Sequence, residues 1–402
     1  MVRKPVRSII GAIDAAAARW TDPDFAPRAR ARDAVGARTG YSAPMVEYAF
    51  DRLFGALRRD SIEAVIADEL GCIDVLDDFA ERAGRPPAHA LPLGRVCVIS
   101  SRTTIGVALL PAIFALCSKC NVLVKDREDH LIAAFFETLG GELEALRDAA
   151  TAQRWSGDED TIDLNGFDVV VAFGNDAILA DLASKLRLPA RFIPFGSKAS
   201  AGYVAREALS DASAAQAIAC GVARDIVLYE SEGCLSLHAL FVETGGAIAV
   251  ERFAAMVADA LGTAAVEFPP VALNAQTAAR FAVARDLATF RAGARGVYSD
   301  RLPGCVAILD PPFEEPPLFL PRTIGIRSVD NASQAAEYLE RHGIALEALA
   351  VAGRRWDLLE LAARTKAARI APFGTLQAPP IGVFHGGRPR IAEFVRWLGD
   401  ET

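Results

Sequence analysis

Residues 94–126 read GRVCVISSRTTIGVALLPAIFALCSKCNVLVKD, and this stretch decides the fold. A β-rich run at 95–99 is followed by a polar turn, a helical stretch over 106–119 and a second β-rich run at 121–126. Strand, turn, helix and strand in this order form a βαβ unit, whose two strands are parallel. A sheet of this kind binds its ligand at the carboxyl ends of its strands.

The same alternation continues toward the carboxyl terminus. A helix at 131–147 leads to β-rich runs at 167–173 and 191–195, with a helix at 177–185 between them. Four strands that alternate with helices predict a doubly wound α/β sheet. The turn Gly174-Asn175 opens a helix whose N-terminus can face a phosphate, although one glycine is a weak dinucleotide signal.

The remaining segments flank this sheet. Residues 1 to about 90 are expected to be helical and carry no evident chemistry. Beyond the sheet, helices are expected at 205–224, 250–262, 335–341 and 356–365, β-rich runs at 297–310 and 322–326, and an apolar run at 344–352.

Composition narrows the class of protein. The chain has 402 residues, is 52% hydrophobic and carries a net charge of −8, with a pI near 5.3. It is therefore long enough for two or three domains and lacks the positive field that nucleic acid requires. Its longest apolar run, 105–117, is shorter than the roughly 20 residues that span a bilayer. With no signal peptide apparent, we expect a cytoplasmic protein.

The seven cysteines predict no metal site and no disulfide framework. Cys117 and Cys120 form a CxxC pair, but the pair lies in an apolar segment and no second pair exists. Buried thiols are the favoured interpretation of this pair.

Cys234 stands in a different setting, within DIVLYESEGCLSLHALFVE at 225–243. A cysteine that follows a glycine at the start of a helix or strand is expected to be exposed and partly ionised. A buried thiol at a junction is the alternative. His238 would share a face with Cys234 on a helix or, at greater distance, on a strand. Glu230 and Glu232 are expected to be solvated.

The order of motifs across most of the chain resembles the aldehyde dehydrogenase superfamily, and more closely its acyl-CoA reductase branch, the LuxC-like fatty acyl reductases. These motifs are NVLVK at 121–125, VAFGND at 171–176, FGSK at 195–198, EGCLS at 232–236, RT at 322–323, PFGTLQAPP at 372–380 and GRPR at 387–390.

The resemblance implies an NAD(P)-binding domain and an α/β catalytic domain that contributes a cysteine nucleophile, here Cys234. It also implies that Lys125 contacts the adenosine ribose or its 2′-phosphate and that Gly174 and Asn175 form the turn against the pyrophosphate. The expected cofactor is NADPH, with NADH as the alternative, and the full expected set is Lys125, Gly174, Asn175, Gly196, Ser197 and Lys198. For Lys198, orienting the cysteine loop and a solvated strand end are the alternatives.

Two departures from the superfamily pattern bear on the reaction. Hydrolytic members carry a glutamate two residues before the Gly-x-Lys motif, and Pro194 stands there instead. Without that base, reduction of an acyl-enzyme is favoured over its hydrolysis. The loop after the first strand lacks the usual oxyanion-binding asparagine, so Arg102 or Thr103 is expected to donate there.

We therefore expect an enzyme that reduces an acyl thioester, from CoA or an acyl carrier, to an aldehyde through a cysteine thioester. Oxidation of an aldehyde to an acid and a non-catalytic acyl-accepting subunit are the alternatives. A homo-oligomer is expected, with an acyl-activating protein as a further partner. The expected domains are a helical region at 1–90, a cofactor domain at 91–224, a catalytic domain at 225–370 and a returning C-terminal segment at 371–402.

Overall fold

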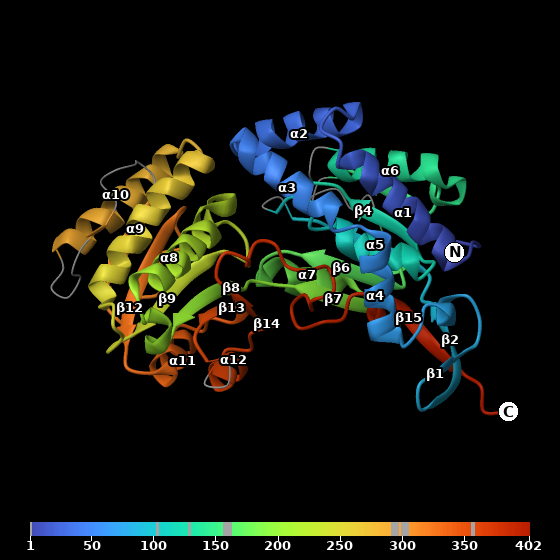
Figure 1. The fold of residues 1–402 in the computed structure, drawn as a ribbon. Helices are drawn as coiled ribbons and strands as arrows, with labels where there is room; N and C mark the ends of the chain where they lie inside the picture. Colours follow the sequence, from blue (N-terminus) through green and yellow to red (C-terminus); the bar gives the residue numbers. More distant parts are fainter. Residues whose placement is uncertain are drawn as a thin grey trace. The chain divides into compact units, whose positions relative to one another are not determined.

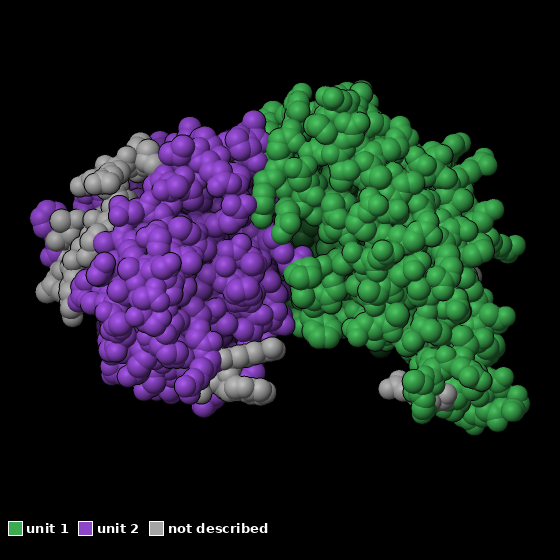
Figure 2. All heavy atoms as spheres, in the orientation of Figure 1, with its two compact units in different colours: residues 1–39, 46–197, 380–402 green, residues 40–45, 198–379 purple. Residues whose placement is uncertain are grey.

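The computed structural model describes residues 2–101, 104–127, 130–155, 163–290, 297–298, 305–354 and 358–402. The chain forms two compact units, coloured separately in Figure 2. Unit 1 comprises residues 1–39, 46–197 and 380–402, and unit 2 comprises residues 40–45 and 198–379. Each unit is built around its own sheet.

The sheet of unit 1 confirms the predicted doubly wound topology. Its five strands lie in the order β5-β4-β3-β6-β7 and are all parallel. The order reverses between β3 and β6, so right-handed crossovers place α5 and α6 on one face and α7 on the other. The strands are β3 (Arg95–Ile99), β4 (Asn121–Lys125), β5 (Ala150–Gln153), β6 (Val169–Phe173) and β7 (Arg191–Phe195), and the helices are α5 (Leu109–Cys117), α6 (Leu131–Glu142) and α7 (Asp176–Lys185).

The N-terminal helices pack on this sheet domain through an aromatic core. The ring of Trp20 lies 4.7 Å from that of Phe54, which stacks on Phe135 of α6 at 5.4 Å between centroids. The indole Nε1 of Trp20 donates to Thr138 Oγ1 at 3.0 Å, so the one polar atom of this ring is satisfied. These helices are α1 (Val6–Trp20), α2 (Ala26–Thr39), α3 (Ala43–Gly55) and α4 (Arg59–Leu70), shown in blue in Figure 1.

The prediction that residues 1 to about 90 are helical is wrong at its end. Residues 80–82 and 85–92 form strands β1 (Ala80–Arg82) and β2 (Arg85–Pro92). Both belong to a small antiparallel sheet of order β1-β2-β15, in which β15 is Val395–Gly399. The pairing partner lies more than 300 residues away in sequence, which local periodicity cannot reveal.

Unit 2 contains a seven-stranded sheet of order β10-β11-β12-β9-β8-β13-β14. All neighbours are parallel except β10 and β11. The strands are β8 (Ala199–Val204), β9 (Leu237–Glu243), β10 (Val297–Tyr298), β11 (Val306–Leu309), β12 (Thr323–Val329), β13 (Leu346–Ala352) and β14 (Arg369–Pro372). The helices are α8 (Ala212–Val227), α9 (Val250–Glu267), α10 (Ala275–Phe290), α11 (Ala332–Arg341) and α12 (Leu359–Arg364).

Strands β8 and β14 of this sheet and helix α10 were not expected, and α8 begins later than expected. β8 is buried along its whole length between β9 and β13. The helix expected at 205–224 starts at Ala212, where Asp211 caps it by accepting from the backbone N–H groups of Ser213 and Ala214. β8 and α8 pack with the later strands, so the longer segment of unit 2 spans residues 198–379, and the tail from 380 lies in unit 1.

Within the described ranges, no helix is both long enough and apolar enough to cross a membrane.

Candidate active site

Four of the expected cofactor residues meet at the carboxyl ends of β6 and β7. The backbone N–H of Gly174 donates to the Phe195 carbonyl at 3.2 Å, which joins the two loops. Asn175 caps α7 by accepting from the Ile178 backbone N–H at 2.9 Å. Asp176 Oδ1 accepts from the Ser197 backbone N–H at 2.9 Å. A glycine is needed at 196, because a Cβ there would lie 2.5 Å from that same carboxylate oxygen.

Lys125 lies at the carboxyl end of β4, and β3 separates it from β6. Its ammonium lies 4.8 Å from the centroid of the Trp155 ring, a cation–π distance. Burial lowers the pKa of Lys125, and the neighbouring Arg127 lowers it further. This strand end thus carries two basic side chains. Arg102 and Thr103, the expected oxyanion donors, lie outside the described residues.

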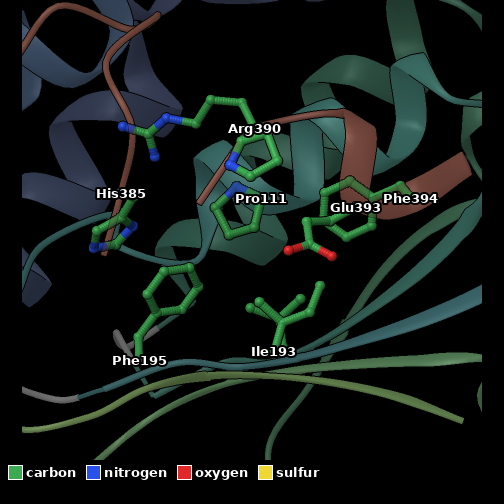
Figure 3. A pocket seen from close by; sticks show the side chains of 9 residues that line it. Pro111, Ile193, Phe195, His385, Arg390, Glu393 and Phe394 are labelled. Carbon is green, nitrogen blue, oxygen red and sulfur yellow. The ribbon is translucent and has the colours of Figure 1, made fainter. Parts of the chain in front are cut away.

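A small cavity lies beside the β7 end of this sheet (Figure 3). The imidazole of His385 stacks on Phe195 at 4.2 Å, and Phe195 stacks on Phe173 at 4.8 Å. Arg191 Nη1 donates to the Glu393 carbonyl at 2.6 Å. These contacts hold the C-terminal tail against β7, a structural role for His385.

The turn before Cys234 in unit 2 has an unusual backbone. Tyr229, Glu230 and Ser231 all have positive φ angles of 56–57°, and Gly233 has φ of 93°. Glycine adopts the last conformation without strain, whereas a side chain there would clash with the backbone. The chain therefore reaches Cys234 in a turn and enters β9 at Leu237.

Cys234 lies at the amino edge of the parallel part of the sheet. Its carbonyl accepts from Ser200 Oγ at 2.8 Å, which ties the loop to the start of β8. Lys198 precedes β8, Glu347 lies near the start of β13, and Arg369 begins β14. Because neighbouring parallel strands start at the same edge, these three charged groups converge toward the cysteine.

The environment of the thiol corrects the expected ionisation. Cys234 is only partly exposed. Burial raises its pKa to about 12, and the Glu347 carboxylate adds to the increase, while its own backbone N–H, Lys198 and Arg369 oppose it. At neutral pH the thiol therefore holds its proton, and the expectation of a partly ionised thiol is wrong.

Lys198 belongs to unit 2, whereas Ser197 directly before it and the other expected cofactor residues belong to unit 1. Its Nζ is 3.2 Å from Oε2 of Glu347, whose side chain is 4% exposed. This position favours the alternative in which Lys198 orients the groups around the cysteine.

Glu230 is not solvated, contrary to expectation. It is buried and pairs with Arg322 through both guanidinium Nε and Nη2. Burial raises the pKa of Glu230, and Arg322 opposes that shift. Glu232 accepts from the Tyr41 hydroxyl at 3.0 Å. Both carboxylates therefore fix the turn that precedes Cys234.

The PFGTLQAPP motif at 372–380 forms hydrogen bonds with residues on both sides of Cys234. The buried carboxylate of Asp225 accepts from the Gly374 and Leu376 backbone N–H groups at 2.6 and 3.0 Å. Gln377 Nε2 donates to Ser236 Oγ at 3.0 Å. Two segments that are remote in sequence thus form one scaffold around Cys234.

His238 lies on β9, so the strand interpretation is confirmed. It is buried, its ring lies 4.8 Å from that of Phe319, and burial lowers its pKa to about 4. Its Nδ1 has no hydrogen-bond partner among the described residues.

Sequence reasoning missed Glu347 and Arg369. Glu347 is the one charged residue in the apolar run at 344–352, and a charge inside a buried parallel strand is the signal that would have found it. Arg369 gives no comparable local signal. Among the described residues, no group of histidine, cysteine or acidic side chains is arranged to hold a metal ion.

The fold is that of the aldehyde dehydrogenases. Aldehyde dehydrogenase 21 from Physcomitrella patens is 11% identical with a TM-score of 0.71, and the alignment covers 99% of this chain and 86% of that one. An oxidoreductase from Marinobacter aquaeolei is 14% identical with a TM-score of 0.73, over 99% and 87% of the two chains. An NAD-dependent benzaldehyde dehydrogenase from Corynebacterium glutamicum is 15% identical with a TM-score of 0.69, over 100% and 87%.

Residues 1–397 match the family described as Acyl-CoA reductase (LuxC). The chain belongs to this family and is therefore an oxidoreductase that acts on aldehyde or acyl groups. Comparison with curated protein sequences found no significant match.

Proposed function

We propose that this enzyme reduces an acyl thioester to an aldehyde, with Cys234 as the nucleophile. The observation that carries the proposal is the place of the thiol: a half-buried cysteine whose loop is fixed by Ser200, Glu230 and Asp225. A nucleophile held by its surroundings loses little freedom on reaction. The family description supports an acyl substrate.

Reduction is favoured over hydrolysis by the residue at 194. Pro194 lies within β7, where it offers no carboxylate to activate water. The carboxylate of Asp176, in the adjoining loop, accepts from the Ser197 backbone N–H. The position that carries the base in hydrolytic members thus supplies none here, which favours reduction of an acyl-enzyme at Cys234 over its hydrolysis.

In the proposed mechanism, Cys234 Sγ attacks the acyl carbonyl and expels CoA or a carrier thiol, leaving the acyl group on the enzyme as a thioester. The backbone N–H of Cys234 and donors at Arg102 and Thr103 are the proposed oxyanion ligands. The nicotinamide cofactor supplies the hydride for reduction. Collapse of the resulting thiohemiacetal releases the aldehyde and the free thiol.

The end of unit 1's sheet fits a dinucleotide. Asn175 caps α7, and the N-terminus of this helix lies at the carboxyl end of β6. A helix N-terminus in this position suits a pyrophosphate. Lys125 and Arg127, two basic groups at the end of β4, suit a ribose 2′-phosphate. We therefore propose NADPH as the preferred cofactor.

Intact-mass spectrometry tests the proposal. The protein is incubated with a panel of acyl-CoA thioesters, with and without NADPH, and the adduct is mapped by peptide digestion. We expect an acyl adduct at Cys234 that disappears when NADPH is added, as aldehyde forms. The matched control is Cys220→Ala, which removes an exposed thiol and should leave the adduct unchanged.

Other outcomes identify the alternatives. An adduct that NADPH does not discharge would identify an acyl-accepting subunit. Formation of acid from free aldehyde and NAD⁺, without CoA, would identify an aldehyde oxidiser. Full aldehyde production by Cys234→Ala would overturn the mechanism.

We also propose that the chain forms a homo-oligomer through the edge strand β15. Trp397 and Leu398 on this strand are 41% and 44% exposed, and an exposed apolar edge strand favours pairing with another chain. Light scattering of the Leu398→Lys variant tests this: we expect a smaller particle than the wild type, and an unchanged mass would contradict it.

A further inference from the structure

Two β-bulges lie at the amino edge of unit 2's sheet, on either side of Ser200. On β13, Leu346 is in register with Ala199 and Ala348 with Ser200, so Glu347 is an extra residue in the register between β13 and β8. On β9, Leu237 pairs with Ser200 and Ala239 with Ala201, so His238 is the extra residue there. A bulge re-aims one side chain and interrupts the ladder locally. Both bulge residues here are ionisable and buried.

Glu347 is held among positive groups that also surround Cys234. Its carboxylate pairs with Lys198 at 3.2 Å, from the segment that leads into β8. At the start of β14, burial lowers the pKa of the Arg369 guanidinium, and its electrostatic interactions with Glu347, Asp225 and Cys234 oppose that decrease. Arg369 Nη2 donates to the Leu376 carbonyl, and its buried Nε has no partner among the described residues. The carboxylate is therefore kept inside the protein by two cations, beside a thiol that retains its proton.

We propose that Glu347 accepts the Sγ proton of Cys234 as the thiol attacks the acyl thioester, and then donates that proton to the departing thiolate. This inference rests on the proposed function. The S–H bond of Cys234 breaks as its sulfur bonds to the acyl carbon, and the bond between that carbon and the leaving sulfur breaks next. The proton ends on the leaving thiol, so the step balances with no change of oxidation state.

Glu347 differs in place and in role from the water-activating carboxylate that hydrolytic members carry at the position of Pro194. The two positions lie on different strands in different units, Pro194 on β7 and Glu347 on β13. A base that touches the thiol proton assists transfer to and from sulfur, and it does not by itself supply the activated water that hydrolysis needs. The inferred role is thus compatible with a reductase.

His238 is the competing candidate for the group that accepts the Cys234 proton, and its surroundings differ from those of Glu347. Burial raises the pKa of Cys234 most and the Glu347 carboxylate raises it further, while the cysteine's own backbone N–H, Lys198 and Arg369 oppose the increase. The His238 ring packs on Phe319 instead. Glu347 is therefore the bulge residue that is coupled to the thiol.

The test compares two reactions of the same thiol in the Glu347→Gln variant. Removing a negative charge stabilises the thiolate, so iodoacetamide should alkylate Cys234 about tenfold faster at pH 8, the equivalent of about one pKa unit. Removing the proton acceptor should slow acylation from acyl-CoA by about a hundredfold. A structural role would move both rates in the same direction. Peptide mapping follows Cys234 separately from the other thiols.

Three further variants complete the test. Glu243→Gln removes an ion-paired carboxylate at the opposite edge of the same sheet and should change neither rate. Glu347→Asp keeps a carboxylate and should recover part of the acylation. The double variant Glu347→Gln/Lys198→Met tests the inference if the single variant unfolds. It removes the lysine that would lose its ion-pair partner, and its acylation should stay slow.

The outcomes distinguish this inference from the proposed function. Wild-type protein that takes no acyl group overturns the proposed function and the inference together. Normal acylation in both the wild type and Glu347→Gln overturns the inference alone. A loss of acylation in His238→Gln, with Glu347→Gln unaffected, assigns the role to His238 and also overturns it.

Discussion

Arg322 forms a two-point ion pair with Glu230 in the interior of unit 2. Arg322 Nε lies 2.8 Å from Glu230 Oε2, and Nη2 donates to the other carboxylate oxygen. The two side chains are 0% and 5% exposed. The backbone N–H of Arg322 also donates to Ser231 Oγ at 3.0 Å, so β12 holds the strained turn that presents Cys234.

Breaking this pair should be far more costly than breaking an exposed one. Arg322→Met leaves a buried carboxylate uncompensated and should lower the free energy of unfolding by about 3–5 kcal/mol. Urea denaturation measures the loss. The control is Arg364→Met, which removes the exposed pair with Glu340 and should cost less than about 1 kcal/mol. Equal losses in the two variants would contradict the assignment.

Gly196→Ala should weaken cofactor binding with little effect on stability. The new Cβ meets the Asp176 carboxylate, which must move away from the Ser197 backbone N–H. Titration of NADPH by protein fluorescence should show an affinity lowered about tenfold, or about 1.4 kcal/mol. Gly141→Ala, whose Cβ meets nothing within 4 Å, should leave affinity unchanged and gain up to about 1 kcal/mol of stability. Equal affinities in both variants would refute the role of this loop.

Lys125→Met should distinguish between the two nicotinamide cofactors. If the ammonium contacts a 2′-phosphate, its loss should weaken NADPH binding by about tenfold or more and leave NADH binding nearly unchanged. The measurement is the ratio of the two dissociation constants. Lys185→Met, at an exposed i,i+4 pair with Asp181, is the control. A parallel loss for both cofactors would place Lys125 at the ribose and not at a phosphate.

Asp225 should make stability fall between about pH 4 and pH 7. Burial raises the pKa of this carboxyl from its ordinary 3.8 to about 7. In this window the unfolded chain releases the proton while the folded chain retains it, so the unfolded state gains stability as pH rises. The group's contribution is complete below about pH 4 and is lost as pH passes through 7, by about 1.4 kcal/mol per pH unit.

The Asp225→Asn variant isolates this effect. It cannot release a proton, so its unfolding free energy should lack this part of the pH dependence. The unfolding free energy of the wild type, relative to that of Asp225→Asn, should be highest at pH 4 and should fall steadily toward pH 7. A difference between the two proteins that stays constant from pH 4 to pH 7 would show that Asp225 does not titrate there.

The sequence predicted the strands whose side chains suit a buried parallel sheet. The runs at β3, β4, β6 and β7 are rich in valine, isoleucine and phenylalanine, so local pattern was enough. β8 reads ASAGYV and escaped prediction, because small residues have low intrinsic strand preference. Gly202 is needed there since a Cβ would lie 2.6 Å from the Phe373 ring. The close approach of Phe373, together with that of Leu240 at 2.9 Å, explains the glycine at this position.

The order of the motifs was enough to predict which residues of the candidate site to consider, but not their protonation or their burial. Cys234 was recognisable from the segments before and after it, but its protonation was not, because burial and Glu347 set it. Glu230 appeared to be a surface residue, since its partner Arg322 lies 92 positions away. Long-range pairing of this kind leaves no trace in local composition.

The bulge at Glu347 also has an evolutionary consequence. Because this residue is the extra one in the register between β8 and β13, its replacement is expected to leave the register of both strands intact. Descendants of one ancestor can therefore exchange the acid for another side chain in a single substitution and try a different reaction on the same cysteine. The sheet would inherit its shape unchanged while the chemistry beside it diversified.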